Sequence, residues 1–193
     1  MKQKGIDSFS GKRVWVIGAS SGIGEACAKA LISSGAKVAI SGRRVEQLNQ
    51  LAGSTPTDQV LALPLDVTNE SQLTQAHQII LERWGGLDLL LFVSGMYVPM
   101  RADEFDIAIA EKTIGTNLLG PMRAVAAVLP TMLKQHAGHI AIVGSVAGYS
   151  GLPKALAYGP AFAPSLKILR CCAISSGFFL PIARRNMSAP PSE

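Results

Sequence analysis

The sequence lacks the features that mark membrane-spanning, disulfide-rich and metal-binding proteins. No apolar run approaches the roughly 20 residues that a membrane-spanning helix needs, and the polar segment from Met1 to Gly11 has no apolar core of a secretory signal. The cysteines, Cys27, Cys171 and Cys172, are odd in number and two are adjacent, which predicts reduced thiols and neither a disulfide framework nor a metal site. We therefore expect a cytoplasmic protein without a membrane partner.

Charged residues are also scarce, at 16% of the chain, whereas hydrophobic residues make up 48%. This balance indicates a globular protein rather than a disordered one. The formal net charge of +5 is concentrated at one end, because residues 1–150 carry 13 basic and 12 acidic side chains, and residues 151–193 carry five basic side chains against Glu193 alone. A nucleic-acid interface gathers cations on a folded face, so we expect no nucleic-acid partner.

What the sequence does contain is a regular alternation of apolar runs and helical patterns. The runs predict strands at 13–17, 37–41, 60–65, 87–93 and 139–144. The helical patterns fall at 22–33, 45–51, 71–84 and 104–135, the last with a break expected near Gly120-Pro121. Strands that are apolar almost throughout belong to a parallel sheet covered on both faces. We therefore predict an α/β fold: a doubly wound parallel sheet of the Rossmann type with three αβα layers, incomplete at its C-terminal edge.

A glycine-rich turn follows the first predicted strand. It reads Gly18-Ala19-Ser20-Ser21-Gly22-Ile23-Gly24 and opens the first predicted helix. Glycines at such a turn let the backbone approach a pyrophosphate, and the helix N-terminus offers free N–H groups. The sequence thus predicts a dinucleotide site that involves Gly18, Ser20, Ser21, Gly22, Ile23 and Gly24. The alternative is a glycine-rich turn that binds nothing.

The end of the second predicted strand bears on the choice of cofactor. An acidic residue there would bind the ribose 2′-hydroxyl of NAD, but the chain has Ser41-Gly42-Arg43-Arg44. Arg43 offers a guanidinium group to a 2′-phosphate, which favours NADP(H) over NAD(H). A solvated pair of arginines is the alternative. Asp66, after the third strand, is placed to accept from the adenine amino group or to form a helix-capping turn.

Several motifs in the right order resemble those of the short-chain dehydrogenase/reductase family. They are the glycine turn, Asp66, Ser94-Gly95, Asn117, Ser145 and Tyr158, and the resemblance covers residues 12–161. It implies an NAD(P)-dependent oxidoreductase that interconverts a small-molecule carbonyl compound and an alcohol, and a homo-oligomer. It also implies cofactor contacts from Val67, Ser94, Gly95 and Tyr158.

The resemblance implies catalytic roles for Asn117, Ser145 and Tyr158. Tyr158 would donate a proton to the carbonyl oxygen, Ser145 would hold that oxygen by a hydrogen bond, and Asn117 would anchor a water relay. The substrate pocket would draw on 94–100 and 146–153, where residues such as Tyr97 suggest an apolar substrate.

Two departures from the family pattern bear on activity. The family's Asn-Asn-Ala-Gly motif is replaced at 92–95 by Phe-Val-Ser-Gly, which keeps only the glycine. The lysine expected four residues after Tyr158 is replaced by Phe162. In the family this lysine lowers the tyrosine pKa and binds the nicotinamide ribose. Lys154 and Lys167 are the candidates to substitute for it, and the alternative is a catalytically impaired or inactive dinucleotide-binding protein.

The family pattern ends near residue 162. We therefore divide the chain into an NAD(P)-binding Rossmann domain at 1–161 and a divergent, partly disordered tail of the same domain at 162–193. Pro164 falls where the family has helix interior, and 177–183 is at most a weak sixth strand. The change of pattern suggests a shifted reading frame or a truncated gene, and it weakens the expectation of a family-type oligomer.

Overall fold

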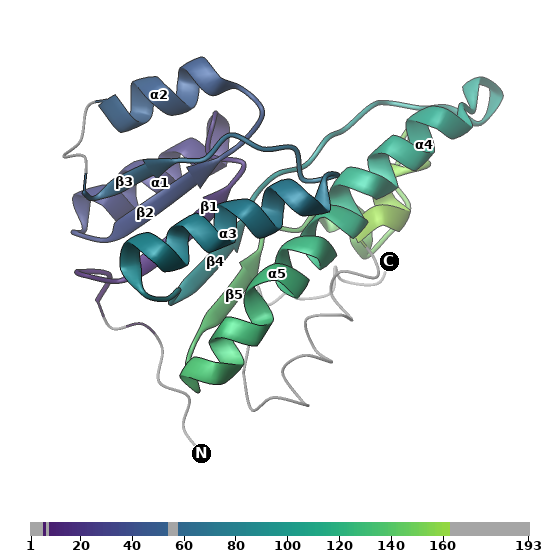
Figure 1. Ribbon diagram of the computed structural model, residues 1–193. Coiled ribbons are helices and arrows are strands. Elements are labelled where there is room, and N and C mark those ends of the chain that lie inside the picture. The colour runs from purple at the N-terminus through teal and green to yellow at the C-terminus, as the bar shows by residue number, and fades with distance from the viewer. Residues whose placement is uncertain (1–5, 7, 54–57, 163–193) are drawn as a thin grey trace, which may run out of the picture.

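Five parallel strands form one sheet in the order β3-β2-β1-β4-β5 (Figure 1). The computed structural model describes residues 6, 8–53 and 58–162. The strands are β1 Arg13–Ile17, β2 Lys37–Ser41, β3 Val60–Ala62, β4 Leu89–Phe92 and β5 His139–Ile142. The chain crosses from β3 at one edge back to β4 beside β1. This is the doubly wound Rossmann-type topology that the sequence predicts.

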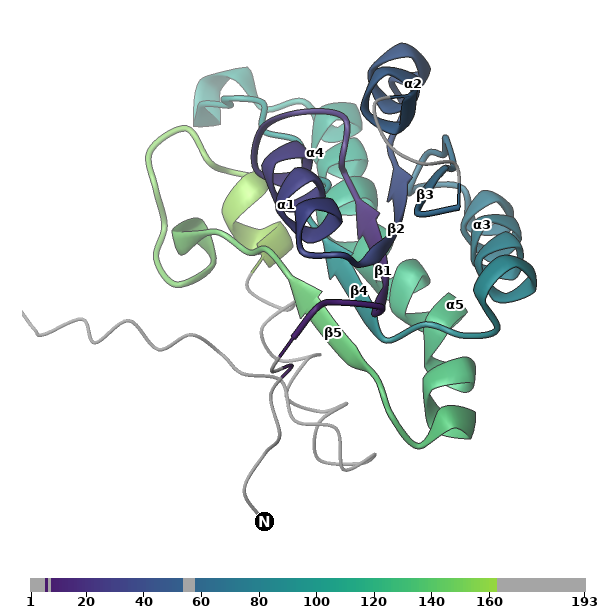
Figure 2. The same cartoon turned by 90° about the vertical axis from the view of Figure 1, so that its left-hand side faces the viewer.

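Helices cover both faces of the sheet, and Figure 2 shows α1 on one side and α3 and α5 on the other. The α-helices are α1 Gly22–Ser33, α2 Val45–Gly53, α3 Glu70–Trp84, α4 Ile107–Ile114 and α5 Gly120–Gln135. A π-helical turn, Gly115–Leu119, joins α4 to α5, and short 3₁₀ turns lie at Ala102–Glu104 and Val146–Gly148. The predicted break near Gly120-Pro121 coincides with a change of hydrogen-bond pattern, because the π-helical turn ends at Leu119 and α5 begins at Gly120, with Pro121 in its first turn.

Alternate side chains of β1 supply two hydrophobic cores. Val14 and Val16 pack with residues of α1 and α2, whereas Trp15 and Ile17 pack with residues of α3 and α5. All four side chains are fully buried. Because successive residues of a strand point to opposite faces, one apolar strand fixes both helical layers against the sheet.

The third strand is shorter than predicted. It ends at Ala62, although Leu63 and Leu65 still donate backbone hydrogen bonds to Ile40 and Gly42, at 2.9 and 3.0 Å. β3 is an edge strand that pairs with β2 on one side only, and its regular strand pairing ends before these last two hydrogen bonds. Leu65 and the residues after it are thereby released to line the cavity described below.

Polar contacts fix the strands at both ends. At the start of β1, Arg13 donates three hydrogen bonds of 2.8 to 2.9 Å to the Asp88 carboxylate, from its backbone N–H and its guanidinium group. At the end of β2, the indole N–H of Trp15 donates to the buried Ser41 hydroxyl at 2.9 Å. Asn69 Oδ1 accepts from Gln72 N at 3.2 Å and caps the start of α3.

Some predictions lie outside the described residues: Lys167, Pro164, the weak sixth strand at 177–183 and the disordered tail. The proposed division of the chain at 161/162 likewise stays a prediction. Among the helices that the structure describes, none combines the length and the apolar character required to cross a bilayer.

Candidate cofactor and reaction site

The glycine turn after β1 is packed closely against the loop after β4. Gly18 has a φ of 99°, and a Cβ on it would lie 2.5 Å from the backbone nitrogen of Ser94. A Cβ on Gly24 would collide with the carbonyl oxygen of Gly18. Both positions therefore require glycine, one for its backbone conformation and close approach and the other for the packing of α1 against the turn.

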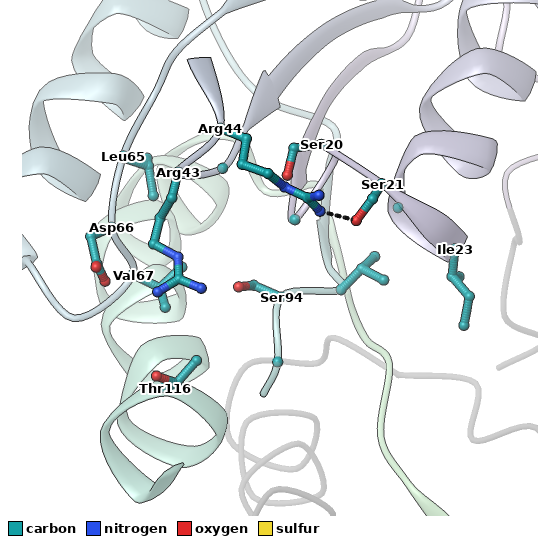
Figure 3. A pocket seen from close by; sticks show the side chains of 15 residues that line it. Ser20, Ser21, Ile23, Arg43, Arg44, Leu65, Asp66, Val67, Ser94 and Thr116 are labelled. Carbon is teal, nitrogen blue, oxygen red and sulfur yellow. Dashed lines mark hydrogen bonds between the residues drawn. The ribbon is translucent and has the colours of Figure 1, made fainter. Parts of the chain in front are cut away.

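The N-terminus of α1 has no side-chain cap. Ser21 is the N-cap residue with an extended φ of −174°, and its hydroxyl makes no hydrogen bond to the first turn of the helix. That hydroxyl instead accepts a hydrogen bond from the Arg44 guanidinium group (Figure 3). The first backbone N–H groups of α1 are thus left for an anion, which is how helix N-termini bind phosphate groups.

A cavity of about 600 Å³ lies at the carboxyl ends of the central strands (Figure 3). This volume is within the range of small-molecule and cofactor sites. Ten of the residues predicted to bind the cofactor line it: Gly18, Ser20, Ser21, Ile23, Gly24, Arg43, Asp66, Val67, Ser94 and Gly95. Gly22 lies in the turn but is not part of the lining, and neither is Tyr158.

Two arginines and one carboxylate give the cavity its charge. Arg43 and Arg44 follow β2 directly, and Figure 3 shows Arg43 extending into the cavity while Arg44 turns toward Ser21. Asp66 is the acidic residue of the lining. No carboxylate lies at the end of β2, so the two guanidinium groups make this wall of the cavity positively charged.

Asp66 lines the cavity and stabilises its own turn, whereas its predicted contact with an adenine amino group stays a prediction. Its carboxylate accepts from Thr68 N and Thr68 Oγ1, each at 2.8 Å. The hydrogen bond from the Thr68 backbone, together with the Thr68 hydroxyl and the charges of Arg43 and Lys112, lowers the pKa of Asp66 although partial burial opposes this. Asp66 is therefore ionised at neutral pH and acts as an acceptor.

Asn117 links the π-helical turn to the loop after β4. It is 1% exposed, its Oδ1 accepts from Met96 N, and its Nδ2 donates to Met96 O, both at 2.8 Å. The side-chain amide thus bonds both backbone groups of one loop residue. The predicted role of Asn117 in a water relay stays a prediction.

Ser145 and Tyr158 come from the segment after β5. Ser145 Oγ accepts from Ala147 N at 3.2 Å and caps the 3₁₀ turn. Tyr158 begins a helical stretch that the structure describes as far as Phe162, with Pro160 in its first turn. Within the described residues no hydrogen bond joins Ser145 to Tyr158, and neither lines the 600 Å³ cavity.

Phe162 occupies the position of the family's lysine and is buried, with 6% of its surface exposed. Its ring lies edge-on to that of Tyr158, with centroids 4.9 Å apart and an interplanar angle of 67°. Lys154, one of the predicted substitutes, is exposed, and in the described part of the chain it makes no ion pair or hydrogen bond to Tyr158. Lys154 has a left-handed backbone φ of 60° and lines a second cavity of about 590 Å³.

This second cavity overlaps the predicted substrate pocket only in part. It lies between the loop after β4 and the segment that leads to Tyr158, which are joined by the parallel bridge of Met100 with Ala155. Its lining includes 100–102, 147–152, 154–156 and 159–160. The catalytic candidates Asn117, Ser145 and Tyr158 are outside that lining, so the cavity adjoins the predicted reaction site without containing it.

Sequence reasoning missed several residues of the first cavity: Gly42, Arg44, Leu65, Val93 and Thr116. Arg44 had a usable signal, because it is adjacent to Arg43 in a chain segment that leaves the sheet. Thr116 had none, because its position depends on the π-helical turn.

The sheet topology, the glycine turn and the cavity at the strand ends define an α/β protein of the dinucleotide-binding class. The family model for short chain dehydrogenase matches residues 12–163. The chain therefore belongs to the short-chain dehydrogenase family, and this family binds NAD(P).

Relatives of known sequence agree with this assignment. An uncharacterised oxidoreductase of Staphylococcus aureus strain MW2 is 36% identical over 134 residues, which are 69% of this chain and 58% of the relative. One from Staphylococcus epidermidis is 33% identical over 146 residues, 75% of this chain and 62% of the relative. This chain thus spans about three fifths of the length of these relatives.

Solved structures share the fold. A short-chain dehydrogenase from Streptomyces avermitilis superposes with a TM-score of 0.82 at 27% identity, covering 89% of this chain and 63% of that one. A 7α-hydroxysteroid dehydrogenase in complex with NADH and a 7-oxo bile acid gives a TM-score of 0.83 at 22% identity, covering 90% and 69%. The second likeness concerns the fold alone.

Proposed function

We propose that this protein binds NADP(H) in preference to NAD(H) and interconverts a small carbonyl compound and its alcohol. The observation that carries the proposal is the pair Arg43 and Arg44 on the wall of the cavity, at the strand end where a carboxylate would select NAD. A 2′-phosphate placed there gains charge-assisted hydrogen bonds. A ribose 2′-hydroxyl would find no carboxylate at the end of β2.

The residues present fit a dinucleotide. The uncapped N-terminus of α1 and the Ser20 hydroxyl supply donors for a pyrophosphate. Arg43 would hold the 2′-phosphate, and the ionised Asp66 would accept from the adenine amino group. Gly95 would permit close approach of a ribose to the backbone after β4.

In the proposed reaction the bound nicotinamide supplies hydride transfer to the carbonyl carbon. The Tyr158 hydroxyl gives its proton to the carbonyl oxygen, so that one hydride and one proton convert the carbonyl group to an alcohol. Ser145 would hold the same oxygen by a hydrogen bond. Asn117 would keep the loop after β4 in place through Met96.

A second candidate is a dinucleotide-binding protein with impaired catalysis, and Phe162 favours it. An apolar ring, 6% exposed, fills the position one helical turn after Tyr158. Phe162 can neither stabilise a phenolate nor bind a ribose hydroxyl. The two candidates share the cofactor site and differ only in turnover.

Titration of the purified chain with NADPH and with NADH, followed by calorimetry, tests the cofactor site. One charge-assisted hydrogen bond contributes about 1.5 to 3 kcal/mol, so Arg43→Ala is expected to weaken NADPH binding by about 10- to 150-fold and to leave NADH binding nearly unchanged. Arg83→Ala, at an exposed position at the end of α3, is the matched control. Equal affinity for both cofactors would refute the NADP(H) preference.

A panel of small aldehydes and ketones with saturating NADPH then separates the two candidates. Consumption of NADPH that disappears in Tyr158→Phe supports the reductase. Tight binding of NADPH without consumption supports the non-catalytic protein.

A further inference from the structure

The ring of Tyr158 contacts two other aromatic rings. Tyr97 and Phe162 each lie edge-on to it, each with centroids 4.9 Å from it and an interplanar angle of 67°. Within the described residues the Tyr158 hydroxyl makes no hydrogen bond. The orientation of this side chain therefore depends on ring contacts, which favour the edge-to-face geometry seen here.

The backbone on either side of Tyr97 is anchored. Met96 directly before it is bonded at both N and O by the buried Asn117 side chain. Met100, three residues after it, donates to Lys154 O at 2.9 Å in the parallel bridge. Tyr97 thus lies on a short span with two fixed ends, and the second end is tied to the segment that leads to Tyr158.

Tyr97 contributes little to the hydrophobic core, since 51% of its surface is exposed and it belongs to neither core cluster. Tyr149 is still more exposed, at 71%, and makes no ring contact within the described residues. Both tyrosines are thus largely exposed, and of the two Tyr97 has the ring contact with Tyr158.

We infer that Tyr97 is a positioning residue for Tyr158, and this rests on the proposed function in which Tyr158 is the proton donor. Phe162 and Tyr97 together restrict the rotamer of Tyr158. A lysine at position 162 would also help to orient the Tyr158 side chain. Tyr97 needs only its ring for this, so Tyr97→Phe retains the effect and Tyr97→Leu removes it.

Fluorine NMR of the full chain, labelled with 3-fluorotyrosine, tests the positioning without any turnover. The chain has three tyrosines, so Tyr158→Phe assigns the resonance of Tyr158. We expect that resonance to move toward its value in the denatured chain in Tyr97→Leu, and to stay in place in Tyr97→Phe and in the control Tyr149→Leu. The same displacement in Tyr97→Phe as in Tyr97→Leu, or none in either, would overturn the inference.

Kinetics supply the second readout if the chain reduces a carbonyl compound. Tyr97→Leu is expected to lower kcat by about 10- to 100-fold, the size of effect that follows misplacement of a reacting group, with an unchanged KM for NADPH. Tyr97→Phe should restore kcat. A chain that binds cofactor without turnover would refute the proposed reductase activity. The NMR result would then decide the role of Tyr97 by itself, so failure of the proposed function and failure of the positioning role are distinguishable.

Discussion

Replacing Phe162 with lysine should change stability and turnover in opposite directions. Phe162 is 6% exposed and packs edge-on against Tyr158. Truncation of a buried phenylalanine costs about 3 to 5 kcal/mol, and an edge-to-face pair contributes about 0.5 to 1.5 kcal/mol of its own. A lysine keeps part of the apolar stem, so we expect Phe162→Lys to lower the free energy of unfolding by about 2 to 4 kcal/mol.

Turnover should rise in the same variant. Residues four apart on a helix share a face, so the ammonium group lies beside Tyr158 and stabilises its phenolate. We expect kcat/KM for carbonyl reduction with NADPH to rise at least tenfold, which corresponds to about 1.4 kcal/mol of transition-state stabilisation. The assay is the loss of NADPH absorbance with a panel of small aldehydes and ketones, at a temperature well below the melting transition.

Phe162→Met is the matched control, because it has a similar length and no charge. It should lose about 1 to 2 kcal/mol of stability and gain no turnover. If Phe162→Lys binds NADPH as well as Phe162→Met does and is no faster, the missing lysine does not limit catalysis, and the reasoning from position 162 is wrong.

Three further predictions concern stability and the cofactor turn. Asp88→Asn should lower the free energy of unfolding by about 1 to 3 kcal/mol near pH 7. Burial alone would raise the pKa of Asp88, but the hydrogen bonds and charge of Arg13 outweigh burial and lower it. The wild type should therefore lose its stability advantage over the variant as the pH falls below about 4. Burial lowers the pKa of His77, so below about pH 6.5 the unfolded chain takes up a proton that the folded chain does not. Urea unfolding should therefore show full stability above about pH 6.5 and a decline below it, and His77→Leu should lack the decline that comes from this site. Gly18→Ala should abolish NADPH binding in calorimetry and lower the free energy of unfolding by about 2 to 4 kcal/mol, since its Cβ would lie 2.5 Å from Ser94 N. Gly53→Ala, at the end of α2, is the control, because nothing lies within 4 Å of a Cβ there.

The local sequence pattern was sufficient to predict the limits of an element where a strand is buried on both faces or where a helix begins at a glycine turn. β1, β2 and α1 begin and end where the sequence predicts, because continuous apolar runs and the glycine turn set their limits. Ten of the twelve predicted cofactor residues line one cavity because the carboxyl ends of parallel strands lie at one edge of the sheet.

What escaped prediction depends on contacts between distant parts of the chain. The early end of β3 follows from its place at the edge of the sheet, which the apolar run at 60–65 does not encode. The bonds of Asn117 to Met96, and of Arg44 to Ser21, join residues 21 and 23 positions apart. The ring contact between Tyr97 and Tyr158 likewise spans separate loops.

The hydrogen bond from Trp15 to Ser41 fixes one end of the segment 41–43 in the core, while the other end faces the cavity. Ser41 is fully buried and fixed to the neighbouring strand, whereas Arg43, two residues later, is exposed at the cavity. We therefore expect substitutions at 43 to leave the scaffold beneath them intact. Under the proposed function, such substitutions should change cofactor preference, in the laboratory or in evolution, with little penalty in folding.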